Sequence, residues 1–175
     1  MIELRVSKYN PNDRNSEGAY SKDTWTSISD IGKIFEGKKL TLSDYLDVEA
    51  NYLKALNYLL DYNRIQSIDI VDSEYFYDHQ IKYIPLEIKD DCELYFDQLK
   101  GKRKISNKDD IIKITLLALR EILWCKLEHR CGFYIHFGYD FYMYSCLIDD
   151  SAILPNISGI YFEKFDSPYK SLVSG

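Results

Sequence analysis

The three histidines of the chain, His79, His129 and His136, are the side chains best suited to acid–base chemistry near neutral pH. Glu128 directly precedes His129, and Asp140 follows His136 by four residues, so a histidine–carboxylate pair in a cleft is conceivable. No zinc-type spacing, nucleophile elbow or phosphate-binding loop accompanies them. We therefore expect His129 to be a cation at a helix C-terminus and His136 to be one side chain of a sheet face. We predict no catalytic residue.

The cysteines show no spacing typical of a metal site or a redox pair, so we predict neither a metal nor a cofactor. The first residues lack the apolar core of a secretory signal, and no apolar run approaches the length of a membrane helix. These features predict a cytoplasmic protein whose thiols are reduced and buried. The four cysteines are Cys92, Cys125, Cys131 and Cys146.

Two further charged features have ordinary explanations. Glu49 lies within the apolar pattern of a predicted helix, so its carboxylate needs a partner, for which a tyrosine or Arg64 is available. The basic run from Lys100 to Lys104 has the charge to contact phosphates. A short basic loop on an acidic protein is more often a solvated connection, and we expect that here.

The segment from residue 69 to residue 97 is the most informative part of the charge distribution. It contains nine acidic and two basic residues, a net charge of −7, whereas the whole chain has a net charge of −6. Aromatic residues are interleaved with the acids, and this combination suits the binding of a basic protein. The alternative is a solvated acidic face. The predicted partner-binding residues are Asp69, Asp72, Glu74, Tyr75, Tyr77, Asp78, Asp90, Asp91 and Glu93.

Two long helices and a hairpin are the elements that would hold these residues. Apolar residues at helical spacing predict helices over Thr41–Asn63 and Ser106–Arg130. The first opens with a capping box of Thr41 and Asp44, and the second has two overlapping candidates, Ser106 with Asp109 and Asn107 with Asp110. Alternating residues over 133–137 and 141–148, joined by a turn at 138–140, predict a central β-hairpin with one face under a helix.

The remaining elements complete an α+β fold. Strands are expected over residues 2–9, within 65–77, within 81–88 and over 159–165, with a short helix over 90–99. Pro85 suggests that the 81–88 strand lies at a sheet edge. We predict an antiparallel sheet of about four to six strands packed against two long helices. Residues 1–175 are expected to form a single domain.

The chain resembles the immunity proteins of bacterial polymorphic-toxin and contact-dependent inhibition systems. The resemblance lies in its small size, acidity, tyrosine content and element pattern, and in the opening segment Trp25–Gly32. It has no diagnostic motif, so no site residue is implied by it. It implies a non-enzymatic cytoplasmic inhibitor that binds one cognate toxin domain, often a nuclease, and blocks its active site.

Three functions follow from these observations. The leading one is neutralisation of a toxin, a basic nuclease domain, by protein binding, without a role for nucleic acid or membrane. The second is a small enzyme that uses His136, His129 or neighbouring carboxylates. The third is a structural or regulatory module that binds itself or another protein. A pocket that gathers histidines and acids would favour the enzyme, and a continuous acidic–aromatic surface would favour the inhibitor.

Overall fold

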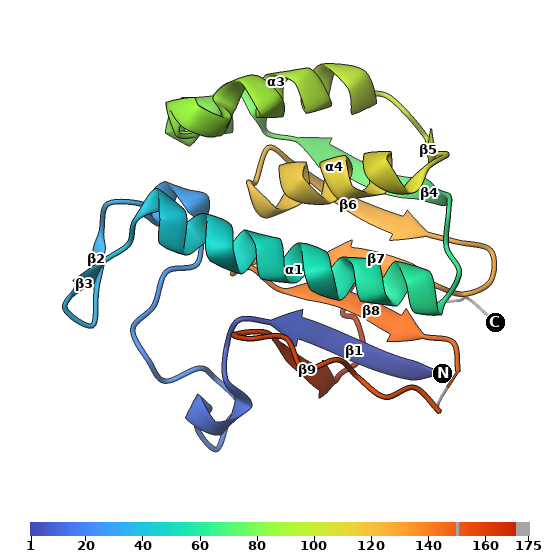
Figure 1. The fold of residues 1–175 in the computed structure, drawn as a ribbon, viewed down its shortest axis with the longest axis horizontal. Coiled ribbons are helices and arrows are strands. Elements are labelled where there is room, and N and C mark those ends of the chain that lie inside the picture. Colours follow the sequence, from blue (N-terminus) through green and yellow to red (C-terminus); the bar gives the residue numbers. More distant parts are fainter. Residues whose placement is uncertain (150, 171–175) are drawn as a thin grey trace.

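The fold is a seven-stranded antiparallel sheet with helices on one face, seen in a computed structural model that describes residues 1–149 and 151–170 (Figure 1). Helices α1 (Leu42–Tyr62) and α4 (Lys108–Leu119) lie across the sheet, and α3 (Leu86–Leu99) packs beside α4. The strand order is β5 (Lys104–Ile105), β4 (Ile68–Tyr75), β6 (Leu123–Glu128), β7 (Tyr134–Phe137), β8 (Met143–Leu147), β1 (Ile2–Ser7) and β9 (Tyr161–Lys164). The α+β class is thus confirmed, with more strands than expected.

The smaller elements lie in the loops. They are the 3-10 turns Pro11–Asp13, Ile28–Asp30 and Ile81–Tyr83, the short hairpin of β2 (Ile34–Phe35) and β3 (Lys38–Lys39), and helix α2 (Tyr77–Gln80). Ser27 caps the second 3-10 turn through a capping box with Asp30. The capping box of Thr41 and Asp44 at the start of α1 is also present, as predicted.

The predicted long helix over Ser106–Arg130 is wrong in its second half, because α4 ends at Leu119 and residues 123–128 form β6. Asn107 is the N-cap of α4. The error arose at Leu123 and Leu127, since a spacing of four residues fits both a helix face and one side of a strand. Buried and half-buried residues alternate along β6, so residues 123–128 follow the period of a strand and not that of a helix.

The predicted edge strand over residues 81–88 is also wrong. Ile81–Tyr83 is a 3-10 turn, and Pro85 is the N-cap of α3, which starts at Leu86. Proline is tolerated here because the amide groups at a helix start have no acceptor within the helix. Ile84, Ile88 and Cys92, spaced by four residues, are the buried side of this segment.

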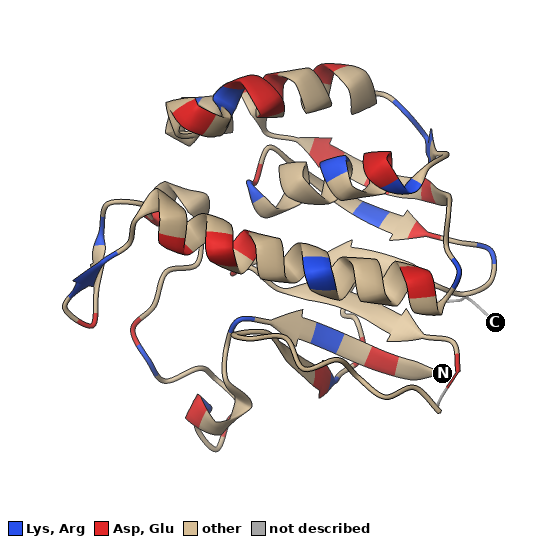
Figure 2. Ribbon diagram, in the orientation of Figure 1, with Lys and Arg blue, Asp and Glu red and all other residues tan. Residues whose placement is uncertain are grey.

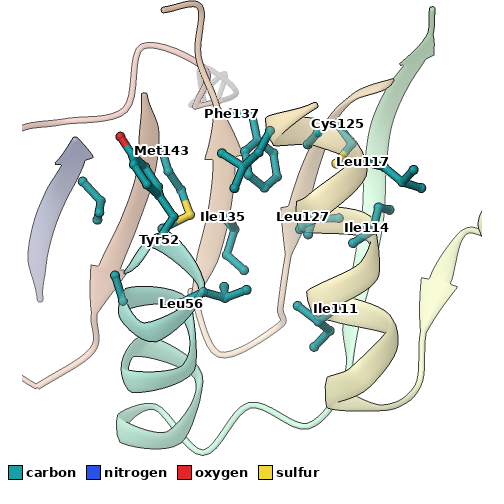
Figure 3. Packing of buried hydrophobic residues seen from close by; sticks show 14 of the residues in the cluster. Tyr52, Leu56, Ile111, Ile114, Leu117, Cys125, Leu127, Ile135, Phe137 and Met143 are labelled. Carbon is teal, nitrogen blue, oxygen red and sulfur yellow. The ribbon is translucent and has the colours of Figure 1, made fainter. Parts of the chain in front are cut away.

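The main core lies between the sheet and the pair α1 and α4 (Figure 3). Side chains along a strand alternate between the two faces of the sheet, so every second side chain of β6, β7, β8 and β1 faces the helices. The aliphatic residues on this side are fully buried: Leu127, Ile135, Met143 and Leu4 are all 0% exposed. The hairpin is therefore central and covered by helices on one face, as predicted. Leu119, at the end of α4, is buried as well.

A buried ion pair crosslinks the helices. Both carboxylate oxygens of Glu49 in α1 accept hydrogen bonds from the Arg120 guanidinium, at 2.8 and 2.7 Å. A third guanidinium nitrogen of Arg120 lies 3.3 Å from the Sγ of Cys92 in α3. The partner of Glu49 is thus Arg120, at the C-cap of α4, rather than Arg64. This pair joins α1, α3 and α4 at the position where α4 ends.

The opposite face of the sheet carries aromatic and charged side chains, and residues 165–170 cross it. Ser167 hydrogen-bonds the Nδ1 of His136 at 2.8 Å. The Tyr169 ring contacts Trp124 and Tyr144, with centroid distances of 5.8 Å in both cases. Nζ of Lys170 pairs with Glu3 in β1. The C-terminal segment therefore replaces a helix layer on this side.

Candidate functional site

The predicted partner-binding residues do not form one strip, because they divide among β4, α2 and α3 (Figure 2). In β4, Asp69, Asp72 and Glu74 pair with the β6 residues that point away from α1 and α4. Asp78 is exposed on α2, next along the chain. Helix α3 carries the remaining acids and lies on the helical side of the molecule.

The solvent side of α3 presents acids and leucines together. Asp90 and Asp91 are exposed, and no ion pair among the described residues involves either of them. Leu86 and Leu94 are 82% and 53% exposed, and their spacing places them beside Asp90 on the helix surface. We call the group Leu86, Glu87, Asp90, Asp91 and Leu94 the α3 surface. The two leucines were not predicted, since the sequence does not show which side of α3 is covered.

The tyrosines of the acidic segment connect β4 with α3. Tyr77 stacks on Phe96 with ring centroids 4.4 Å apart, and Tyr75 meets the same ring edge-on at 5.7 Å. The Tyr75 hydroxyl accepts a hydrogen bond from the Gly101 amide, yet the side chain remains 44% exposed. Tyr77 is more buried, and Glu93 is half-buried. Of these three predicted residues, Tyr75 is the one most available to a partner.

A pocket of about 710 Å³ lies at the end of the sheet where α4 ends and β6 begins. Its walls come from four stretches distant in sequence: the end of β4 with α2, the α4–β6 turn, the β7–β8 turn and the C-terminal segment. The lining residues include the carboxylates Glu74, Glu121 and Asp140, together with His79 and Gln80. Seven aromatic residues also line it: Phe76, Trp124, Phe137, Tyr139, Phe141, Tyr142 and Tyr169.

Glu121 is the most constrained carboxylate of the pocket. One oxygen, Oε2, accepts hydrogen bonds from Ser27 Oγ and Gln80 Nε2, both at 2.8 Å. Burial raises the pKa of this carboxyl, and the charge of Asp30 adds to the shift, although the two hydrogen bonds act in the opposite direction. Its charged form is therefore less favourable than that of a solvated glutamate.

The backbone at Glu121 explains how its side chain reaches the pocket. Glu121 has a φ of +58°, a left-handed conformation that glycine usually supplies after a helix. Its amide bonds the carbonyl of Ala118, and the Ile122 amide bonds that of Leu117, which is a Schellman stop. Because the residue is not glycine, the stop was not recognisable in the sequence, and the helix was predicted to continue.

The β7–β8 turn forms another strained wall. Asp140 and Phe141 have φ values of +57° and +64°. Tyr9 and Tyr52 hold the turn, since their hydroxyls donate to the carbonyls of Asp140 and Phe141, each at 2.6 Å. Three of the five non-glycine residues with positive φ in the described chain thus line this pocket. Such strain persists where the surrounding structure enforces it, and it often marks a functional site.

The histidines are not gathered in one cleft. His136 is 1% exposed on β7, and burial, with the charge of Lys126, lowers its pKa to about 4. His129 does not end a helix, because it follows β6 in a turn, where its Nδ1 lies 2.8 Å from Cys131 Sγ. His79 alone lines the pocket. His136 is a sheet residue, as predicted, whereas the expected position of His129 is wrong.

All four cysteines are free thiols; Cys131 is exposed, while the others are buried as expected. No group of three or more potential metal-binding side chains occurs within residues 1–149 and 151–170. In the same ranges, no helix combines the length and the apolarity required to cross a membrane. Comparison with protein-family models, with curated proteins and with solved structures gave no match.

Proposed function

We propose that this protein is a non-catalytic inhibitor that binds and neutralises a basic toxin domain in the cytoplasm, as the immunity proteins that it resembles do. The observation that carries the proposal is the α3 surface, where carboxylates that have no ion pair among the described residues lie beside exposed leucines. Carboxylates accelerate the encounter with a basic partner, and large apolar side chains hold the complex once water is excluded.

The acids of β4 extend this recognition to a second side of the molecule. Asp72 has only a 3.7 Å contact with Lys126, and Asp69 has no ion pair among the described residues. Tyr75, the last residue of β4, contacts Phe96 of α3 and keeps an exposed ring. A partner that extends from the solvent side of β4 to α3 would contact both groups of acids. A nuclease is a suitable partner, because its phosphate-binding surface is positively charged.

An enzyme based on His129 or His136 has less support. His136 is buried with Ser167 and Glu128 as its hydrogen-bond partners, and His129 contacts Cys131 in an exposed turn. Neither lines the pocket, but His79 lies there with Glu74, Glu121 and Asp140, which is the observation that favours an enzyme at a different histidine from the two expected. A regulatory module that binds another protein would use the same α3 surface, so the identity of the partner distinguishes it from the inhibitor.

The test first asks whether a gene beside the one for this chain encodes a toxin domain, and then combines growth protection with binding kinetics on that domain. Co-expression is expected to restore growth, and the purified proteins are expected to associate faster at low salt. Asp90→Lys with Asp91→Lys should slow association about tenfold or more and weaken its salt dependence. Asp72→Lys with Glu74→Lys tests the β4 side in the same way.

The matched control is Asp47→Lys with Glu17→Lys, which makes the same change in net charge at exposed positions outside both acidic groups. Leu94→Ala and Tyr75→Ala should mainly accelerate dissociation. If wild type fails to bind and protect against that domain, the inhibitor proposal is wrong. If both acidic double variants associate and protect like the control while folded, the proposed surface is wrong.

A further inference from the structure

We propose that the pocket at the end of the sheet is a binding site for an organic cation, an ammonium or guanidinium group attached to an apolar body. This inference goes beyond the proposed function and does not require it. It rests on the chemistry of the pocket walls, on one carboxylate oxygen that has no hydrogen-bond partner among the described residues, and on the strained backbone of two turns that form the walls.

The lining residues include more acidic than basic side chains, since His79 is accompanied by three carboxylates. Glu74, Glu121 and Asp140 bring three carboxylates to the pocket, and none of the described residues that line it is lysine or arginine. Elsewhere in the described chain, several carboxylates are paired; Glu49 and Glu163, for example, both bind arginine. Lys8 already attracts Asp140, so the negative charge that a bound cation would balance lies mainly on Glu74 and Glu121, and the shape of the pocket concentrates the attraction for such a ligand.

The walls also suit a cation through their aromatic faces. The Trp124 indole N–H donates to the Phe137 carbonyl at 2.7 Å, which fixes the orientation of this ring at the pocket wall. Two rings of the pocket wall already lie near a basic side chain of a residue that does not line the pocket. Lys126 Nζ lies 5.9 Å from the Trp124 ring centre, and the Arg5 guanidinium carbon lies 5.2 Å from that of Tyr142. Cation–π attraction operates over such distances.

Glu121 offers a specific contact. Its Oε2 is occupied by Ser27 and Gln80, whereas no hydrogen bond of Oε1 is present among the described residues. A carboxylate oxygen accepts a charge-assisted bond from an ammonium or guanidinium donor. The raised pKa of this carboxyl means that its negative charge lacks full compensation, and a bound cation would supply it. Ser27 and Gln80 would meanwhile hold the side chain in position.

The size of the pocket indicates more than a bare ion. A volume of about 710 Å³ falls within the range of sites that enclose small organic molecules. The cation has two possible sources: a free amine or guanidine, or a basic side chain presented by a bound protein. The chemistry of recognition is the same, so the probes must distinguish them.

The experiment is titration calorimetry with the intact chain in the absence of any partner. Phenethylamine, with the neutral analogue 2-phenylethanol, represents the free molecule. The peptide acetyl-Gly-Arg-Gly-amide, with citrulline in place of arginine as the neutral control, represents the presented side chain. At least one cation is expected to bind, about tenfold or more tightly than its neutral analogue. Binding of the amine alone assigns a free ligand, and binding of the peptide alone assigns a protein side chain.

Variants then localise the binding. Glu121→Gln keeps the size of the side chain and should weaken binding about tenfold or more. Glu74→Gln changes an exposed carboxylate at the pocket and should weaken binding less, so it serves as the second variant if Glu121→Gln does not fold. Glu17→Gln, on an exposed loop, is the matched control. Equal binding of cations and neutral analogues, no binding of either cation, or unchanged affinity in both pocket variants would overturn the proposal.

Discussion

The two faces of the central strands differ in how they are stabilised, although the same strands supply both. On the face under α1 and α4, residues such as Leu127 and Ile135 are aliphatic and 0% exposed. On the other face, Arg5 and Arg14 both bind Glu163, and His136 lies beneath Ser167. The first face depends on non-directional burial, and the second on directed contacts with a short C-terminal segment.

This difference should determine how each face of the sheet responds to substitution. Burial of aliphatic side chains supplies most of the folding free energy and tolerates little change in volume. The opposite face and the sheet end leave aromatic rings and carboxylates partly accessible, as in the pocket beside Trp124 and Glu121. We therefore expect large losses of stability from changes on the helical side and smaller ones from changes on the other side.

The largest effect is expected at the buried ion pair on the helical side. Arg120→Met should lower the free energy of unfolding by about 3–5 kcal/mol, because it leaves the Glu49 carboxylate buried without a partner. The double variant Glu49→Met with Arg120→Met should recover much of that loss. Urea denaturation of wild type and the two variants measures both effects. A single variant as stable as wild type would show that Glu49 finds another partner or is not charged.

The comparison of the faces is tested most directly on two adjacent strands. Ile135→Ala, on the helix-covered face, should cost about 2–5 kcal/mol, since it opens a cavity in the core. Lys126→Ala, on the opposite face of β6, should cost less than about 1 kcal/mol, because its 3.7 Å contact with Asp72 is weak and partly exposed. Equal losses in chemical denaturation would contradict the assignment of the faces.

The opposite face should respond to pH through His136. Burial lowers the pKa of His136 from 6.5 to about 4, so the unfolded chain binds the proton more readily between these values. The free energy of unfolding should then fall by up to about 3 kcal/mol as the pH drops from 6.5 to 4. Above pH 6.5, His136 should cause no pH dependence of stability. His136→Gln should lose this part of the pH dependence. An unchanged pH profile of stability in that variant would mean that His136 titrates normally.

A small effect is also expected where β1, β9 and the first loop meet. Glu163→Gln should cost about 1 kcal/mol, because Arg5 and Arg14 lose the charge of their shared partner but keep an acceptor. Thermal unfolding at two salt concentrations measures it, and the difference from wild type should shrink at high salt. A loss as large as that of Ile135→Ala would mean that ion pairs stabilise this face as strongly as burial stabilises the other.

Local signals in the sequence were sufficient to predict an element where residues a few positions apart determine its structure. The start of α1 follows from Thr41 and Asp44, which bond each other's backbone within one turn. The β7–β8 hairpin follows from the period-two alternation on either side of a short turn. Such features depend on residues a few positions apart, so no knowledge of the fold is required to recognise them.

Other features were ambiguous because the same residues fit two different local patterns. Leu123 and Leu127 fit a helix as well as a strand, and only the pairing of β6 with β4 and β7 selects the strand. Pro85 fits an edge strand as well as a helix start, and the burial of Ile88 and Cys92 against the core selects the helix. Tertiary packing overrides a local preference when it buries more apolar surface.

By itself, the sequence determined the α+β class, the first long helix, the central hairpin and the excess of acid in residues 69–97. The tertiary structure alone decided that these acids divide between β4 and α3, and that Glu49 meets Arg120. It also decided that Glu74, Glu121 and Asp140 share a pocket. The physical reason is distance along the chain: a helix or turn is specified by nearby residues, whereas a pocket forms only when the packing of the core brings remote segments together.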